Sequence, residues 1–271
     1  MAKQTRLRAP YLKKISLLPE RADRVSFPFN TLKFLADEFE MSFDRPITLF
    51  VGENGSGKST LLEGIASLAG FHSYGGSRQH QVYKRVRHNQ KDDDELSDDE
   101  DDSVPPGRIL AKALRPAWLP RVSNGYFFRA ESFFNVASYL DEVGDTRRRG
   151  ILHQQSHGES FLSLFKDQLG GGRPSMYLLD EPEAALSPAR QLVFICLMRR
   201  WEEEGNVQAI IATHAPILMA YPGARILEFR RGRIREVHFE ETEHFQVMRA
   251  FFRDPRGYLE GIISGEDNSD E

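Results

Sequence analysis

The feature that most constrains this chain is a glycine-rich loop set between a buried-strand pattern and a helix pattern. Residues 47–51 read ITLFV and are nearly continuously apolar, as expected of a parallel strand buried on both faces. Residues 58–68 then repeat apolar side chains at helical spacing. A glycine-rich loop in this context wraps phosphate groups with backbone amides and directs a helix N-terminus at them. We therefore predict a nucleoside triphosphate site formed by Gly52, Glu53, Asn54, Gly55, Ser56, Gly57, Lys58, Ser59 and Thr60.

Two residues of this loop have predicted chemical roles. The Lys58 ammonium is placed to reach the β- and γ-phosphates and to assist catalysis, and the Ser59 hydroxyl is placed to ligate Mg²⁺. The strand, loop and helix context makes a chance match to this pattern improbable.

A second apolar strand, at residues 176–179, ends in two carboxylates. Asp180 follows the strand directly, where a carboxylate can orient the magnesium shell. Glu181, the next residue, is the predicted catalytic group that polarises the attacking water. The alternative is that the paired acids only cap a helix.

A histidine follows the next apolar strand, at residues 207–212. In that position the imidazole of His214, neutral or protonated, is able to hydrogen-bond a γ-phosphate. A lone histidine is more often structural, and its place after the carboxylate strand favours the catalytic role.

A further phosphate-directed segment, Ser156–Ser160, reads SHGES and precedes a helical pattern. It offers the Ser156 hydroxyl, the Gly158 amide and a helix N-terminus to an anion. Because the glycine-rich loop already holds the triphosphate, a second such element suggests a site completed in trans by another copy.

Composition limits the class of protein. The chain has 271 residues, 40% of them hydrophobic, and a net charge of −4, which fits one large globular α/β domain over residues 1–271. No apolar run approaches the roughly 18 residues of a spanning helix, and no secretory signal is evident, so we expect a cytoplasmic protein. Cys196 lies among apolar residues and is expected in the core.

The middle of the chain differs from both ends. Short alternating segments before residue 50 predict strands, whereas residues 72–122 show no clear pattern of helices or strands. Within that stretch, residues 91–102 contain nine acidic residues and one lysine. Such a run predicts a disordered loop that is either merely solvated or screens the basic stretch before it.

The order of the four motifs resembles the ABC ATPase superfamily. The sequences GENGSGKSTLLEGIA, SHGESF, LLDEPEAALSP and THAP are similar to bacterial stand-alone "AAA family" ATPases related to SMC and RecF proteins. The resemblance covers about residues 10–70 and 125–262. It implies a P-loop NTPase fold of the ABC ATPase-head type: α/β, with a mostly parallel central sheet, an N-terminal antiparallel β region and a smaller helical lobe or insertion at about residues 72–172. It also implies head-to-tail dimerisation, as a homodimer or heterodimer, around two ATP molecules.

The sequence departs from this pattern at the glutamine that follows the first strand of the helical lobe. Arg129, Ala130 and Glu131 follow the corresponding strand here. Glu131 is therefore the candidate for the magnesium-sensing position.

Three functions remain open from the sequence. The leading hypothesis is an ATPase that hydrolyses ATP as the motor or switch of a nucleic-acid-linked repair or defence complex, with DNA or an effector such as a nuclease as partner. Basic clusters at residues 3–14, 147–149 and 230–235 motivate it. The alternative is the ATP-binding cassette subunit of a membrane transporter. The third is a regulatory module that binds ATP and scarcely turns it over.

Overall fold

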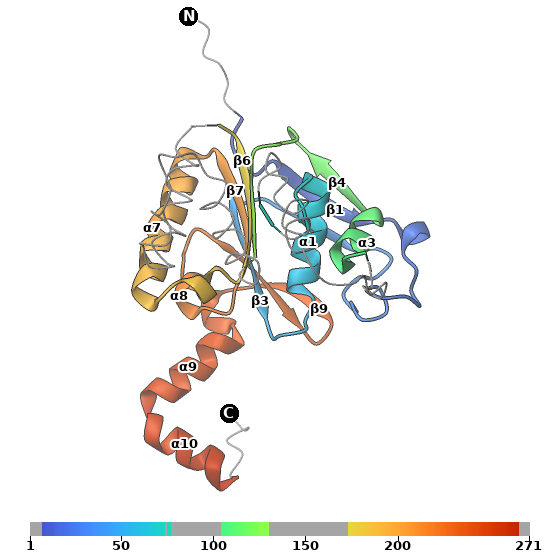
Figure 1. The fold of residues 1–271 in the computed structure, drawn as a ribbon. Coiled ribbons are helices and arrows are strands. Elements are labelled where there is room, and N and C mark those ends of the chain that lie inside the picture. Colours follow the sequence, from blue (N-terminus) through green and yellow to red (C-terminus); the bar gives the residue numbers. More distant parts are fainter. Residues whose placement is uncertain (1–6, 74, 77–103, 130–172, 266–271) are drawn as a thin grey trace, which may run out of the picture.

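The computed structural model describes residues 7–73, 75–76, 104–129 and 173–265, and its centre is a six-stranded sheet (Figure 1). The strands run in the order β5-β6-β7-β3-β8-β9. They comprise β3 (Ile47–Gly52), β5 (Gly125–Arg129), β6 (Ser175–Asp180), β7 (Val207–Ala212), β8 (Arg225–Arg230) and β9 (Arg233–Val237). All neighbours pair in parallel except β8 and β9, so the sheet is mostly parallel, as predicted.

Both faces of this sheet are covered, which explains the continuous apolar runs in its strands. Every residue of β3, β6 and β7 is buried. Figure 1 shows α1 (Lys58–Ala69) on one side of the sheet and α7 (Pro188–Glu204) on the other. Successive strand residues alternate between the two cores: Phe50 packs in the cluster with Leu61, and Leu49 in the cluster with Trp201. The sheet is therefore a rigid platform buried on both faces.

A separate three-stranded antiparallel sheet lies beside the α1 face, in the order β2-β1-β4. It contains β1 (Leu12–Leu17), β2 (Glu40–Ser42) and β4 (Leu114–Trp118). The short helices η1 (Pro19–Arg21) and α3 (Pro106–Lys112) flank it in the chain. The predicted N-terminal antiparallel region is thereby confirmed, with β4 as a third strand that the sequence did not reveal. Pro116 is tolerated in β4 because that strand lies at the edge of its sheet.

One buried amide ties the two sheets together. Gln208 of β7 is fully buried, and its Oε1 accepts hydrogen bonds from the backbone amides of Tyr11 and Leu12 at 2.8 and 2.7 Å. Its Nε2 donates to the carbonyl of Leu12 at 3.0 Å. The start of β1 is thus fixed to the central sheet by three hydrogen bonds from one side chain.

In the sequence, strand-like runs at residues 225–229 and 234–239 flank residues 230–233 (RRGR) and predict a hairpin, which the structure forms as the antiparallel pair β8 and β9. Its turn residues Arg231 and Gly232 have φ values of 51° and 71°. Two successive positive φ angles are typical of a type I′ turn, whose twist matches that of the flanking strands.

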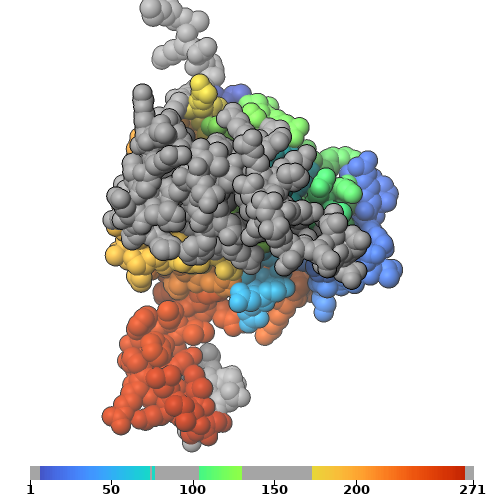
Figure 2. Space-filling view, viewed as in Figure 1, coloured from blue at the N-terminus to red at the C-terminus, as the bar shows by residue number. Residues whose placement is uncertain are grey.

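The C-terminal part of the chain leaves the sheet. After η2 (Pro182–Ala185), α8 (Pro216–Met219) and η3 (Phe239–Glu241), the chain ends in α9 (Glu243–Arg253) and α10 (Pro255–Ser264). Figures 1 and 2 show this pair, which we call the C-terminal arm, projecting below the body of the molecule. The sequence predicts a helical tail over residues 242–263, and the structure divides this tail into two helices at Asp254. There the Asp254 carboxylate caps the amide of Gly257 at 3.1 Å and Pro255 begins the next helix.

Two further expectations meet the structure only in part. Within the predicted lobe at residues 72–172, α3, β4 and β5 belong to the layers just described, and most of the remainder, including the acidic run 91–102, lies outside the described residues. The expectation that Cys196 is in the core is wrong, because it is exposed on α7 while Phe194 and Met198 face the sheet. In the described part of the chain, none of the helices has the length and apolar character needed to cross a membrane.

Candidate functional site: a phosphate loop and the strand ends beside it

The glycine-rich loop leaves β3 under tight steric constraint. Gly52 has a φ of 136°, and a Cβ atom there would lie 2.3 Å from the carbonyl oxygen of Phe229. Gly57, at the N-cap of α1, has a φ of 96°, and a Cβ there would meet Leu32 at 2.5 Å. Side chains are therefore excluded from both ends of the loop.

The loop leads directly into the first turn of α1. That turn contains no acidic residue, and its first amides have no intrahelical acceptor by helix geometry. Glu53, Asn54 and Gly55 are exposed at the tip of the loop, and Ser56, Ser59 and Thr60 are half-buried. This arrangement is able to receive a polyphosphate from the solvent side.

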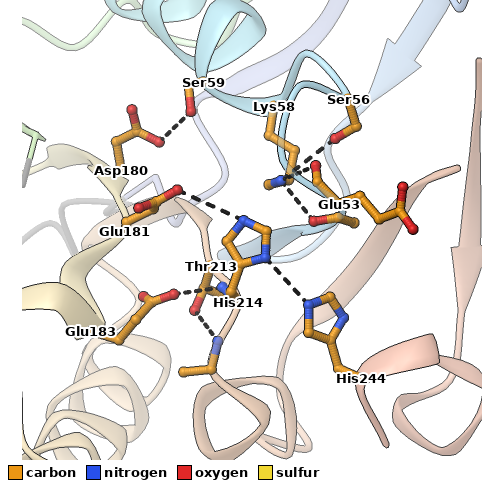
Figure 3. Close-up of polar contacts among 12 residues, drawn as sticks. Glu53, Ser56, Lys58, Ser59, Asp180, Glu181, Glu183, Thr213, His214 and His244 are labelled. Atoms are coloured by element: carbon orange, nitrogen blue, oxygen red, sulfur yellow. Dashed lines mark hydrogen bonds and ion pairs between the residues drawn. The ribbon is translucent and has the colours of Figure 1, made fainter. Parts of the chain in front are cut away.

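Lys58 is buried, and its ammonium group bonds to its own loop. Its Nζ donates to the carbonyls of Gly52 at 2.7 Å and Glu53 at 2.8 Å, and lies 3.5 Å from the Ser56 hydroxyl (Figure 3). Burial lowers the pKa of Lys58, and the nearby carboxylates of Glu181 and Asp180 oppose that shift.

The predicted magnesium ligands meet although they are far apart in sequence. The Ser59 hydroxyl donates to Oδ1 of Asp180 at 2.9 Å. Asp180 ends β6, Gly52 ends β3, and only β7 separates these strands. The pairing therefore follows from the strand order, since carboxyl ends of parallel strands meet at one edge of a sheet.

The residues present fit Mg²⁺. Ser59 and Asp180 supply hard oxygen donors next to the phosphate loop. Among the described residues no group of three or more His, Cys, Asp or Glu side chains forms a metal cluster. A site of one hydroxyl and one carboxylate suits an ion that takes its other ligands from phosphate and water.

Glu181 adopts an unusual backbone conformation directly after β6. Its φ and ψ are 51° and 55°, a left-handed conformation that costs a non-glycine residue roughly 1–3 kcal/mol. Its Oε1 lies 3.7 Å from Nε2 of His214, as the dashed line in Figure 3 shows. The structure thus brings together Lys58, Ser59, Asp180, Glu181 and His214, five residues that the sequence assigned to one site.

Burial and the nearby cation keep the histidine neutral. Burial lowers the pKa of His214 to about 4, and Lys58 and His244 contribute to the same shift. Between the protonated and neutral forms that the sequence left open, the structure therefore selects the neutral imidazole at physiological pH.

Two residues that hold His214 were missing from the sequence prediction. Oε1 of Glu183 accepts a hydrogen bond from the His214 backbone amide at 2.5 Å, and burial raises the pKa of Glu183. His244 lies 3.3 Å away through its Nε2. Glu183 carried a signal, as a third acid after the strand. His244 carried none, because it follows His214 by 30 residues.

A third neighbour of the site is Arg129, which ends β5. Its Nε lies 3.9 Å from Oδ2 of Asp180. The predicted residues Glu131, Ser156 and Gly158 lie outside the described residues, as does the basic cluster 147–149.

The mostly parallel sheet, the glycine-rich loop after β3 and the carboxylate at the end of β6 give this chain a P-loop NTPase type of fold. Comparison with known proteins agrees: residues 29–104 match the family model described as "AAA domain". A curated relative, the hemin import ATP-binding protein HmuV of Methylobacillus flagellatus, is 36% identical over 67 residues.

The extent of these similarities is limited. The matched region covers 25% of this chain and 25% of the hemin import protein, so this chain spans about a quarter of that relative's length. Among solved structures, an inward-facing putative metal-chelate type ABC transporter has a TM-score of 0.47 at 14% identity, covering 90% of each chain. The ATP-binding cassette MJ1267 has a TM-score of 0.45 at 18% identity, covering 92% of this chain and 97% of its own. The fold assignment rests on the strand order and the site, and these two values add nothing to it.

Proposed function

We propose that this protein binds MgATP at the phosphate loop and hydrolyses it, with Glu181 as the general base. The observation that carries the proposal is the convergence of Lys58, Ser59, Asp180, Glu181 and His214 at one sheet edge. Phosphoryl transfer needs this set: a cradle for phosphates, oxygen ligands for a metal ion and a carboxylate that orients water.

Each of these residues has a separate proposed role in hydrolysis. Lys58 would exchange its loop carbonyls for phosphate oxygens, and Ser59 with Asp180 would hold the metal ion. When bound, Mg²⁺ offsets the charge on the β- and γ-phosphates. Glu181 accepts a proton from the water that attacks the γ-phosphorus, the bond to the leaving ADP oxygen breaks, and His214 hydrogen-bonds the γ-phosphate. Most of the rate acceleration then comes from groups positioned in advance.

We further propose that the site is completed by a second copy. In this arrangement Ser156 and Gly158 of the opposite protomer close over the γ-phosphate. The support is the sequence of that segment, its resemblance to the ABC signature, and the open solvent side of the loop tip. Glu131 as a magnesium-sensing residue, the single domain over residues 1–271 with its helical lobe at 72–172, and a cytoplasmic location also stay predictions.

The test is the mass in solution of Glu181→Gln with and without MgATP. This variant should bind ATP without hydrolysing it and therefore accumulate as a dimer only with nucleotide. Glu260→Gln, an exposed acid of α10, is the matched control and should not accumulate. A Glu181→Gln protein that binds ATP and stays monomeric would contradict completion by a second copy. A variant with wild-type turnover would contradict the role of Glu181.

For the load, the comparisons favour the alternative over the leading hypothesis of the sequence analysis. The curated relative is named a hemin import ATP-binding protein, which supports the cassette subunit of a membrane transporter. The comparisons give no support to a repair or defence complex, and its DNA or nuclease partner therefore rests on the SMC/RecF-like wording of the motifs and the basic clusters of the sequence.

The two loads are separated by one pair of measurements. A cassette should form a stable complex in detergent with a co-expressed polytopic membrane subunit, which should stimulate its turnover. A DNA-linked ATPase should bind short duplex DNA with an affinity that falls steeply between low and physiological salt. Replacing Arg231 and Arg233, which are exposed at the β8–β9 turn, should reduce only the second.

A further inference from the structure

A second histidine lies against His214, on the opposite side of its ring from Glu181 (Figure 3). Nε2 of His244 is 3.3 Å from Nδ1 of His214, and the ring centroids are 5.5 Å apart. His244 is the second residue of α9, so the contact joins the catalytic edge of the sheet to the first turn of the C-terminal arm.

Both rings are neutral at physiological pH. Burial and the Lys58 cation lower the pKa of His244 as they lower that of His214. A neutral imidazole carries one N–H donor and one bare nitrogen acceptor. Two neutral rings at hydrogen-bonding distance therefore share one proton, and either ring is able to supply it.

The surroundings of His214 decide which ring donates. Its Nε2 faces Oε1 of Glu181 at 3.7 Å and has no hydrogen-bond partner among the described residues. A carboxylate only accepts hydrogen bonds, and so do the oxygens of an incoming γ-phosphate. The proton of the His214 ring is therefore favourably placed on Nε2, which leaves Nδ1 as an acceptor that needs a donor.

We propose that His244 is a positioning residue that donates its Nε2–H to Nδ1 of His214 and so keeps the His214 proton on Nε2, directed at the reacting phosphate. The inference deepens the proposed function, because it concerns the same site and rests on it. In the opposite tautomer His214 presents a bare nitrogen to Glu181 and phosphate, and two acceptors then face each other.

The position of His244 is itself fixed by the fold. Thr242 is fully buried, caps α9 and accepts a hydrogen bond from the amide of Phe245 at 3.3 Å. Next to it, Glu243 pairs with Arg230 of β8 at 3.7 Å. The first turn of α9 is thus anchored on the sheet although no residue of that helix is buried. The histidine pair therefore lies where the arm meets the candidate site.

The first test reads the tautomer directly. In nucleotide-free protein labelled with ¹⁵N-histidine, ring nitrogen spectra should show the His214 proton on Nε2. Replacing His244 by leucine should move a measurable share of that proton to Nδ1, and replacing it by glutamine, whose amide is able to donate, should restore Nε2. Arg249→Ala, an exposed change on the same helix, is the control and should leave the spectrum unchanged. A His214 proton on Nδ1 in the wild type, or no change on His244→Leu, would overturn the proposal.

The second test reads turnover. His244→Leu should lower the rate at saturating MgATP about tenfold with little change in ATP affinity, and His244→Gln should recover most of it. Equal loss in both variants would mean that the ring only fills space, and thermal melting of each variant checks folding. Should the wild type itself fail to hydrolyse ATP, the proposed function fails, while the tautomer measurement still decides the role of His244.

Discussion

The catalytic edge of the central sheet and the C-terminal arm are built on opposite principles. At the edge, short segments from β3, β6 and β7 converge, and the strands that carry them are completely buried. In the arm, α9 and α10 contain no buried residue, and several large apolar side chains face solvent: Val247, Met248, Phe252, Leu259, Ile262 and Ile263. The candidate site thus lies where the backbone has least freedom, whereas the arm is held to the body mainly at its first turn.

The largest difference between the regions should appear in turnover. Glu181→Gln should reduce ATP hydrolysis by about 10²–10⁴-fold, because the attacking water loses its proton acceptor. Glu260→Gln in α10 makes the same chemical change on the arm and should leave the rate within a factor of about two. Steady-state phosphate release measures both. A comparable loss of ATP hydrolysis in Glu260→Gln would show that the arm also contributes to turnover.

A pair of phenylalanines compares packing in the two regions. Phe194 is fully buried, with its ring edge-on to Trp201 at 5.7 Å, so Phe194→Ala should lower the free energy of unfolding by about 3–5 kcal/mol. Phe252 is 68% exposed, and Phe252→Ala should change it by less than about 0.5 kcal/mol. Urea titrations supply both values. A large loss at Phe252 would show that the arm is packed in solution.

A pair of glutamines compares hydrogen bonding in the same way. Gln208→Leu leaves the buried amides of Tyr11 and Leu12 and one carbonyl without their partner, at a cost of about 1–3 kcal/mol. On α9, the side-chain amide of Gln246 donates only to the exposed carbonyl of Glu240 among the described residues. Gln246→Leu should therefore leave the free energy of unfolding almost unchanged. The same titrations decide, and equal costs would contradict the comparison.

The smallest expected effect lies at the junction of the regions. Addition of MgATP to Glu181→Gln should slow amide exchange a few-fold at residues 246–249 of α9. The reason is that the histidine pair links the start of this helix to His214 at the candidate site. Residues 259–263 of α10 should exchange at an unchanged rate. Mass spectrometry of peptides from both segments tests this. Slowing confined to the phosphate loop would show that the arm does not respond to the nucleotide.

Those parts of the fold that depend on local rules were predictable. The strand at 47–51, the loop and the helix from Lys58 form one continuous pattern. Asp180 is the last residue of β6, and His214 lies two residues after the end of β7. Parallel strand ends converge whatever the intervening sequence, so the site was predictable without knowing the full topology.

What the sequence did not predict depends on contacts between distant residues. β4 contains Pro116, which argues against a strand unless its place at a sheet edge is known. Gln208 bonds the backbone of Leu12 and Tyr11, from which it is separated by 196 and 197 positions in the sequence. The arm has the apolar spacing of a buried helix. In the described part of the chain, however, none of the residues of α9 and α10 is buried, and the sequence pattern does not reveal this. For the same reason Cys196 was placed in the core, although its neighbours on α7 alternate between sheet and solvent.

The bonds that Lys58 makes within its own loop bear on ligand discrimination. Its ammonium already meets two carbonyl oxygens at 2.7 and 2.8 Å, so a ligand gains only the difference between these bonds and its own. Each further phosphate group adds oxygens that are able to occupy the loop amides, the helix terminus and Lys58 together. If the loop binds nucleotides as proposed, a triphosphate should therefore bind more tightly than a monophosphate of the same base.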